Sequence, residues 1–300
     1  MNKHAYLIMA HNEFYILEKL ILLLDDLRND IYIHIDSKVK NFNFKYYKKL
    51  VKRSNIYFVE RKNVRWGHMS QIKCEILLLK ESIGRNYRYY HLLSGVDLPI
   101  KTQDEIHSFF EENDGYEFIH FCSEEKTNNI KDRVLHYNFM RYHRSNKDIR
   151  IISNKLNNII KKIQYKINYE RKWDKNIEIY FGSNWFSITN ELVKYILENE
   201  EWINVSFKYS SCADEVFLQT LVCNSKFKKN LFMNIFNNDY KSCLREIDFK
   251  NGNPYIYRIN DFNKLINSEN LFARKFDSRI DKEIINEIFN YLLRVEYKQT

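Results

Sequence analysis

The first hundred residues alternate short apolar runs with segments of helical periodicity, and this alternation constrains the fold more than any other feature of the sequence. Short apolar runs between turn signals predict buried strands, and apolar residues that recur about every 3.6 positions predict amphipathic helices. We expect strands at residues 5–9, 31–36, 56–59 and 89–93, and helices at 14–27, 46–51 and 70–83. Such alternation favours an α/β fold with a Rossmann-like, mostly parallel central sheet flanked by helices.

Polar residues follow each of these predicted strands directly. His11 follows the first strand, Asp36 ends the second, residues 65–70 come after the third, and residues 94–97 come after the fourth. In open α/β sheets, ligands bind beyond the carboxyl ends of the strands. We therefore expect a binding cleft at this edge of the sheet.

The stretch 94–99 reads Ser-Gly-Val-Asp-Leu-Pro and cannot continue a strand, because glycine permits unusual backbone angles and proline removes a hydrogen-bond donor. Thr102 and Glu105 then form a capping box that begins a helix. A hydroxyl and a carboxylate are thereby presented at the expected cleft. The alternative is an ordinary strand–turn–helix junction, just as Asp36 either contacts a ribose or base or merely caps its own turn.

Other features narrow the class of protein. The sequence has no G-x-G-x-x-G and no G-x-x-x-x-G-K-[ST] motif, which disfavours a nicotinamide enzyme and a P-loop NTPase. The net charge of +9 indicates an anionic partner, or only a lysine-rich composition. Five cysteines without C-x-x-C spacing predict free thiols in a reducing compartment. With no signal-peptide layout and no apolar run of about 18 residues, we expect a cytoplasmic location.

Residues 152–167 have the pattern of an amphipathic helix, with apolar residues on one face and lysines on the other. Such a helix either packs its apolar face on the core, which is the commoner arrangement, or lies on an anionic membrane surface near a lipid-linked substrate. The basic segment considered for membrane contact spans residues 152–173. No nucleic-acid partner is expected, because no recognised nucleic-acid-binding signature is present.

A later stretch carries groups suited to sugar binding. After a predicted strand at residues 177–181, Gly182 and Ser183 are small, and Trp185 offers a flat apolar face to a sugar ring. Trp185 is as readily explained as a core residue.

Two further sets of charged residues complete the series. Asp214 and Glu215 open a predicted helix, where carboxylates are also ordinary partners of the helix dipole. Arg258, Arg274 and Lys275 form a late cationic set suited to a diphosphate.

Taken in order along the chain, these motifs resemble the core-2/I-branching glycosyltransferase family, which includes peptide O-xylosyltransferases and many bacterial members. The matching stretches are 33–38, 66–70, 93–101, 182–186, 214–215 and 271–276, so they span nearly the whole chain. The resemblance implies one GT-A-type domain over residues 1–300, with a nucleotide-binding half at 1–125 and an acceptor and catalytic half at 126–300. It also implies a UDP-sugar donor, an inverting mechanism that forms a β-linkage, and no cofactor or divalent metal.

The resemblance also implies roles for individual residues. Glu215 corresponds to the catalytic base, although the family's Ser-Pro-Asp-Glu reads Cys-Ala-Asp-Glu here and lacks the proline. The family's late arginine and lysine neutralise the diphosphate where other GT-A enzymes use a metal held by Asp-x-Asp, and no such triplet occurs in this chain. Lys275 matches the lysine, while Arg258 is assigned to the arginine with Arg245 as the second choice. The residues expected at the nucleotide and diphosphate are His11, Asp36, Arg65, Trp66, Gly67, Ser70, Arg258, Arg274 and Lys275. Those expected at the donor or acceptor sugar are Ser94, Gly95, Asp97, Gly182, Ser183, Trp185 and Asp214.

The sequence therefore predicts an inverting, metal-independent glycosyltransferase that moves GlcNAc from UDP-GlcNAc to a glycan or lipid-linked glycan. One base suffices to activate an acceptor hydroxyl, and fixed positive charge stabilises a departing diphosphate. A bacterial surface-polysaccharide enzyme, cytoplasmic or on the inner face of the cell membrane, fits these features. The alternatives are the same fold with UDP-xylose or another donor, and a non-catalytic glycan- or nucleic-acid-binding protein.

Overall fold

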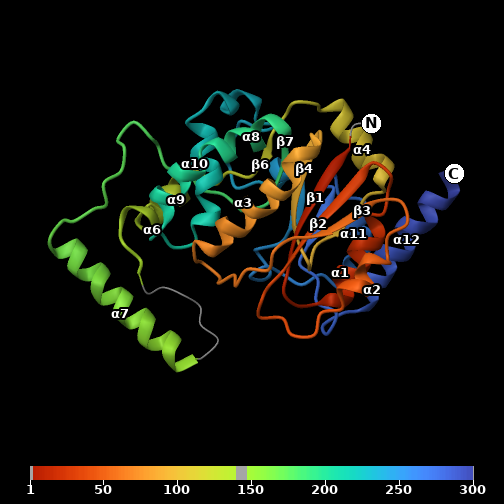
Figure 1. Cartoon of the computed structure of the whole chain (residues 1–300), viewed down its shortest axis with the longest axis horizontal. Helices are drawn as coiled ribbons and strands as arrows, with labels where there is room; N and C mark the ends of the chain where they lie inside the picture. Colours follow the sequence, from red (N-terminus) through yellow and green to blue (C-terminus); the bar gives the residue numbers. More distant parts are fainter. Residues whose placement is uncertain (1–2, 140–146, 300) are drawn as a thin grey trace.

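The computed structural model describes residues 3–139 and 147–299, and a six-stranded sheet lies at the centre of this part of the chain (Figure 1). The strand order is β3-β2-β1-β4-β7-β6. The strands are β1 (His4–Ala10), β2 (Asn29–Ile35), β3 (Asn55–Phe58), β4 (Tyr89–Ser94), β6 (Phe118–Ile119) and β7 (Phe186–Thr189). The first four are paired in parallel, whereas β7 joins β4 and β6 in antiparallel fashion. The carboxyl ends of β1, β2, β3 and β4 consequently lie at one edge.

Helices cover both faces of this sheet, because the side chains of each strand point alternately to opposite faces. Tyr6 and Ile8 of β1 belong to one buried cluster, together with residues of α1 (Phe14–Leu23), α4 (Gln103–Glu112) and α12 (Glu283–Gln299). Ala5 and Leu7 belong to the other cluster. The helices that contribute to that second cluster are α3 (Ser70–Ser82), α8 (Asn190–Glu198), α9 (Glu200–Phe207) and α10 (Phe217–Cys223). The predicted α/β fold, with a mostly parallel central sheet between helical layers, is confirmed.

A smaller sheet lies beside the main one, in the order β5-β9-β8. It consists of β5 (Leu98–Pro99), β8 (Arg245–Ile247) and β9 (Phe272–Arg274). Leu98 pairs with Ala273 in antiparallel register, so the residues that flank this pair, Asp97 and Arg274, are brought together. The small sheet thus delivers the late basic segment of the chain to the edge where β4 ends.

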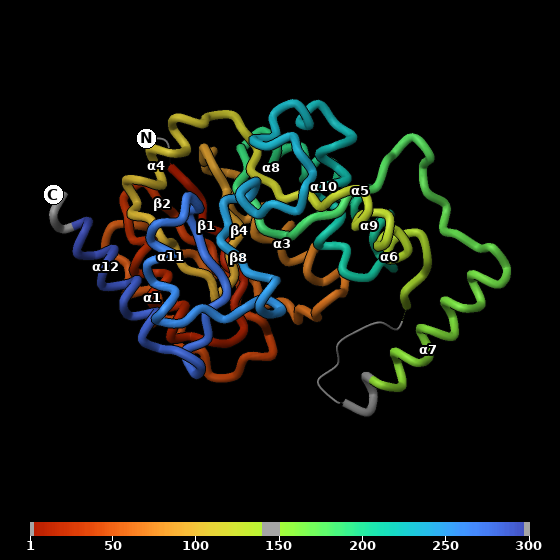
Figure 2. Tube along the Cα trace, turned by 180° about the vertical axis from the view of Figure 1, so that it is seen from behind, coloured from red at the N-terminus to blue at the C-terminus, as the bar shows by residue number. Residues whose placement is uncertain are grey.

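The remaining helices are α2 (Phe44–Lys48), α5 (Glu124–Ile130), α6 (Asp132–Leu135), α7 (Lys147–Lys166) and α11 (Phe262–Ile266). Figures 1 and 2 both show α7 at one end of the molecule, away from the central sheet. Within the part of the chain that the structure describes, no helix is sufficiently long and apolar to span a bilayer.

Two predictions about local structure are wrong. Residues 177–181 form no strand, because a side chain of α10 holds this segment: the Thr220 hydroxyl accepts a hydrogen bond from the backbone N–H of Tyr180 at 3.1 Å. The strand of this region is β7, which begins directly after Trp185. The expectation that the 152–167 helix packs its apolar face on the core is also wrong, because Ile159 and Ile163 in α7 are each 53% exposed.

Candidate active site

Asp36 directly follows β2, at the edge of the sheet where the sequence predicts a cleft. Asp36 is only 3% exposed and accepts hydrogen bonds from the backbone N–H groups of Lys38 at 2.8 Å and Val64 at 3.2 Å. The Lys38 ammonium lies 3.2 Å from the same carboxylate. Asp36 therefore caps its own turn, which is one of the two roles predicted for it, and it also anchors the loop after β3.

His11 lies near this carboxylate, and Lys275 lies near His11. Partial burial lowers the pKa of His11, the charge of Asp36 opposes that shift, and the charges of Lys38 and Lys275 add to it. Segments from three distant parts of the sequence thus converge where β1 and β2 end. A nucleotide phosphate placed here would meet cationic side chains, as anion recognition requires.

A hydrogen bond joins the loop that contains Arg65, Trp66, Gly67 and Ser70 to the segment just before Asp214 and Glu215. Its shape is fixed by the Ser70 hydroxyl, which accepts a hydrogen bond from the Arg65 N–H at 2.8 Å. Gly67 adopts a φ of +69°, in the left-handed region that favours glycine, and its carbonyl accepts a hydrogen bond from the Cys212 N–H at 2.9 Å. Trp66 is 57% exposed and so presents its ring at the surface.

The turn after β4 is built around the fully buried carboxylate of Asp97. Asp97 accepts hydrogen bonds from the Ser94 N–H at 2.8 Å and the Ser94 hydroxyl at 2.7 Å. Gly95 is required because a Cβ at this position would lie 2.9 Å from the Cβ of Ala10. The Nε of Arg274 lies 3.7 Å from Asp97 Oδ1. Asp97 thereby orients a cation as well as the turn.

Arg274 in turn lies over the indole of Trp185, with its guanidinium carbon 4.0 Å from the centre of the ring. Burial lowers the pKa of this guanidinium and the Asp97 carboxylate opposes the change. This cation–π contact connects the turn after β4 with the segment before β7. Trp185 is not a simple core residue, because it also lines a cavity.

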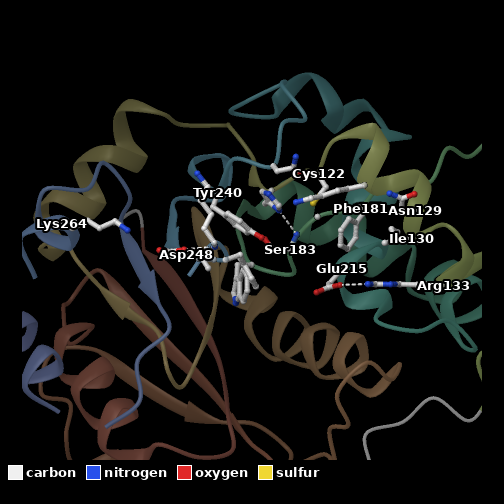
Figure 3. A pocket seen from close by; sticks show the side chains of 18 residues that line it. Cys122, Asn129, Ile130, Arg133, Phe181, Ser183, Glu215, Tyr240, Asp248 and Lys264 are labelled. Carbon is white, nitrogen blue, oxygen red and sulfur yellow. Dashed lines mark hydrogen bonds and ion pairs between the residues drawn. The ribbon is translucent and has the colours of Figure 1, made fainter. Parts of the chain in front are cut away.

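That cavity has a volume of about 760 Å³ and lies beside the carboxylate of Glu215 (Figure 3). Gly182 and Ser183 line it, and Gly182 must be glycine because a Cβ there would lie 1.8 Å from the carbonyl oxygen of His120. On another wall the ring of Tyr240 stacks on that of His120, with 4.1 Å between the centroids. Aromatic faces, small residues and a carboxylate together suit a sugar.

Glu215 ends a short 3₁₀ turn and forms an ion pair that lines the cavity. Its Oε2 accepts a hydrogen bond from Nη1 of Arg133 at 2.9 Å, and Figure 3 shows the two side chains pointing toward each other. Burial raises the pKa of Glu215, while the Arg133 charge opposes that rise. A carboxylate that stays ionised yet has increased proton affinity is suited to act as a general base near neutral pH.

Two further carboxyl groups lie behind Glu215. Burial, followed by the Glu215 charge, raises the pKa of Asp214 to about 7. Asp214 Oδ2 accepts a hydrogen bond from Gln71 Nε2 at 2.7 Å. Burial and the neighbouring Asp214 also raise the pKa of Glu75, in α3, well above its usual range. Neighbouring like charges disfavour one another's ionisation. Of these three carboxyl groups, Glu215 has the arginine partner, which favours its ionised form.

The two arginines considered for the diphosphate occupy other places. Arg258 is exposed, and its backbone N–H donates to Asp261 at 2.8 Å at the start of a short 3₁₀ turn. Arg245 is 1% exposed, and its guanidinium donates to the carbonyl oxygens of Cys243, Leu92 and Phe186 at 2.6, 3.2 and 3.2 Å. Neither arginine lines the cavity. The late cations that meet predicted site residues are Arg274, at Asp97 and Trp185, and Lys275, near His11.

Sequence reasoning did not find Arg133, Gln71, Glu75 or Tyr240. Arg133 lies 82 positions from its partner Glu215 in a segment without any motif. A charged residue at position 75 of a predicted amphipathic helix gives no sign that it is buried. For these residues the sequence contains no local signal.

A family model described as "Branch: Core-2/I-Branching enzyme" matches residues 4–265. The chain is 23% identical to xylosyltransferase 2 of Rattus norvegicus over 98% of this chain and 34% of the relative. It is 24% identical to xylosyltransferase sqv-6 of Caenorhabditis briggsae over 85% of this chain and 32% of the relative. The chain spans about a third of the length of these curated relatives.

Among solved structures, mouse xyloside xylosyltransferase 1 in its apo form is similar with a TM-score of 0.39 and 9% identity, over 91% of this chain and 97% of that chain. A likeness at this score carries no argument. The family model, in contrast, covers most of the sequence and contains most of the predicted motifs in order. The chain belongs to the core-2/I-branching enzyme family.

Proposed function

We propose that the protein is an inverting glycosyltransferase that transfers a sugar from a UDP-sugar to a hydroxyl group of a glycan acceptor. The observation that carries this proposal is the Glu215–Arg133 pair, whose charged atoms are 2.9 Å apart. This pair lines the same cavity as Trp185, and Arg274 lies over the Trp185 ring. A base, a sugar-sized cavity and a cation therefore meet in one place. Family membership supports the same class of reaction.

In the proposed step, the Glu215 carboxylate takes the proton of the acceptor hydroxyl as its oxygen attacks the anomeric carbon. The bond from that carbon to the diphosphate oxygen breaks, and UDP leaves with the electron pair. Attack opposite to the leaving group inverts the anomeric centre and gives a β-linkage from an α-linked donor. Arg274 and Lys275 supply fixed positive charge for the departing diphosphate, so we propose that no divalent metal or other cofactor is needed.

UDP-GlcNAc is the first candidate donor, with Asp36 and the loop at 65–70 at the nucleotide and Asp97 near the sugar. UDP-xylose is the second candidate, because the relatives described above are named xylosyltransferases. We further propose a glycan or lipid-linked glycan acceptor, a role in bacterial surface polysaccharide synthesis, and a location in the cytoplasm at the inner face of the membrane. In this arrangement residues 1–125 bind the nucleotide, residues 126–300 serve the acceptor and catalysis, and no nucleic acid is involved.

The test is UDP release from a panel of UDP-sugars in the presence of EDTA, for the wild type and for Glu215→Gln. We expect turnover that survives EDTA and falls by roughly 100-fold or more in Glu215→Gln, since a general base typically contributes about 10²–10⁴-fold. Glu201→Gln, at an exposed position in α9, is the matched control. Strict dependence on manganese would refute metal independence, and an absence of both turnover and UDP binding would refute the transfer itself.

A further inference from the structure

Helix α7 is turned so that its polar face meets the protein and its apolar face meets solvent. The Gln164 side chain accepts a hydrogen bond from the Tyr137 N–H at 2.8 Å and donates to the Tyr137 carbonyl at 3.1 Å. Ser153, Asn157 and Gln164 are 3%, 2% and 6% exposed, respectively. On a surface helix these polar residues are normally the exposed ones. The docking of α7 therefore uses hydrogen bonds and leaves its hydrophobic side uncovered.

The uncovered side is a continuous apolar stripe. It consists of Ile152, Leu156, Ile159, Ile163 and Ile167, which are 58%, 41%, 53%, 53% and 64% exposed. At about 100° of rotation per residue these five side chains fall within roughly 80° of one another around the helix axis. Single exposed apolar residues need no explanation, but a row that runs the length of a helix indicates a binding surface.

A row of lysines flanks the apolar stripe on the side away from the body of the protein. Lys155, Lys162 and Lys166 are all exposed, and by helical geometry they lie about 60–110° from the centre of the stripe. Lys161 is directed differently, since its ammonium lies 3.4 Å from Asp132 in α6. Residues 151–166 contain no aspartate or glutamate. The helix is thus bordered by the protein on one side and by positive charge on the other.

We propose that the stripe and lysine row of α7 bind the surface of an anionic lipid bilayer. A helix that lies in the plane of the interface buries its apolar face below the headgroups and holds lysines at headgroup level, where they meet lipid phosphates. A second copy of this chain is a poorer partner, because facing lysine rows repel and residues 151–166 supply no acidic side chain to pair with them. Nucleic acid offers phosphates but no apolar surface for the isoleucines. This inference rests on the membrane location in the proposed function and deepens it. Its test uses neither donor nor acceptor, so its failure is distinguishable from a failure of the transfer reaction.

The test is co-sedimentation of the full chain with vesicles of phosphatidylglycerol mixed with phosphatidylcholine, compared with pure phosphatidylcholine. We expect binding to the anionic vesicles that weakens as salt is raised from about 0.1 to 0.5 M. Ile159→Asn with Ile163→Asn is expected to weaken binding at least about tenfold, because both side chains would enter the apolar layer. Lys155→Gln with Lys162→Gln and Lys166→Gln is expected to weaken it on the order of 100-fold, about fivefold for each lysine.

Matched controls exist elsewhere on the surface. Ile235 and Ile280 are 64% and 52% exposed, so their paired replacement by asparagine tests exposed isoleucines in general. Lys45, Lys48 and Lys49 are exposed, and their replacement by glutamine removes the same charge. Both controls are expected to bind vesicles as the wild type does. Three results would each overturn the proposal: no binding to anionic vesicles, equal loss in the controls, or a dimer that the Ile159/Ile163 pair of changes dissociates without any vesicle affinity.

Discussion

Replacing Arg133 with methionine is expected to move the acid limb of the activity profile to higher pH. Methionine keeps much of the aliphatic length of arginine but removes the charge that lies 2.9 Å from Glu215. Coulomb's law at 2.9 Å gives about 1.4 kcal/mol in bulk water and roughly 6 kcal/mol at an effective dielectric constant of 20. The two side chains are 28% and 36% exposed, which places the pair near the aqueous limit, at about 2 kcal/mol. A loss of about 2 kcal/mol disfavours the ionised carboxylate of Glu215 roughly 30-fold, which raises its pKa.

The direction follows from the proposed role of Glu215 as a base, because only the ionised carboxylate can accept the proton of the acceptor. Burial already raises the pKa of Glu215, and loss of the opposing arginine raises it further. The assay is kcat/KM for UDP release between about pH 5 and 9, which reports groups of the free enzyme. Arg133→Lys keeps the charge and is expected to retain the wild-type midpoint, as is Lys126→Met, which removes a different cation lining the same cavity. An unchanged or lower midpoint in Arg133→Met would refute this assignment of the base.

Two further predictions concern a buried acid and a late cation. The pKa of Glu75 is raised in the folded protein, so wild-type stability falls as pH rises from the pKa of the unfolded state through that of the folded state. Glu75→Gln removes this loss, so its stability gain over wild type in thermal unfolding is expected to grow with pH, by up to about 1.4 kcal/mol per pH unit. The exposed control Glu81→Gln is expected to show no such growth. A gain that stays constant between pH 5 and 8 would contradict a protonated Glu75. Lys275→Met is expected to lower kcat/KM for UDP-sugar turnover by roughly 10- to 100-fold, because stabilisation of the diphosphate is lost. Lys229→Met, at an exposed position, is expected to leave kcat/KM unchanged. Equal values for the two variants would show that Lys275 does not belong to the site.

The ends of the first strands could be predicted because their signals are local. A buried strand followed at once by a polar residue has few other interpretations, and Asp36 and the 94–97 turn lie at the edge where parallel strands end. The position of Arg274 beside this edge depends on strand pairing, which no local pattern in the sequence reveals. The pairing of β5 with β9 brings Asp97 next to a residue 177 positions later.

The orientation of α7 and the Arg133–Glu215 pair could not be predicted, for two physical reasons. An amphipathic pattern defines two faces of a helix but does not say which of them meets the protein. Hydrogen bonds from Gln164 to the backbone of Tyr137 decide that here, and glutamine carries no signal for such a contact. Arg133 reaches Glu215 only through the packing of α6, which depends on the fold as a whole.

The buried guanidinium of Arg245 has a consequence for the reorganisation free energy of the proposed reaction. It joins the strand β8 of the small sheet to the carbonyl oxygens of Leu92 in β4 and Phe186 in β7, and it lies 4.4 Å from the ring centre of Phe272 in β9. The small sheet is therefore fixed to the main sheet before any ligand arrives, and Arg274 at its end is fixed with it. Charge that is already in position costs little reorganisation free energy when a diphosphate departs. Arg245 thus preorganises the cation that we propose to stabilise the diphosphate.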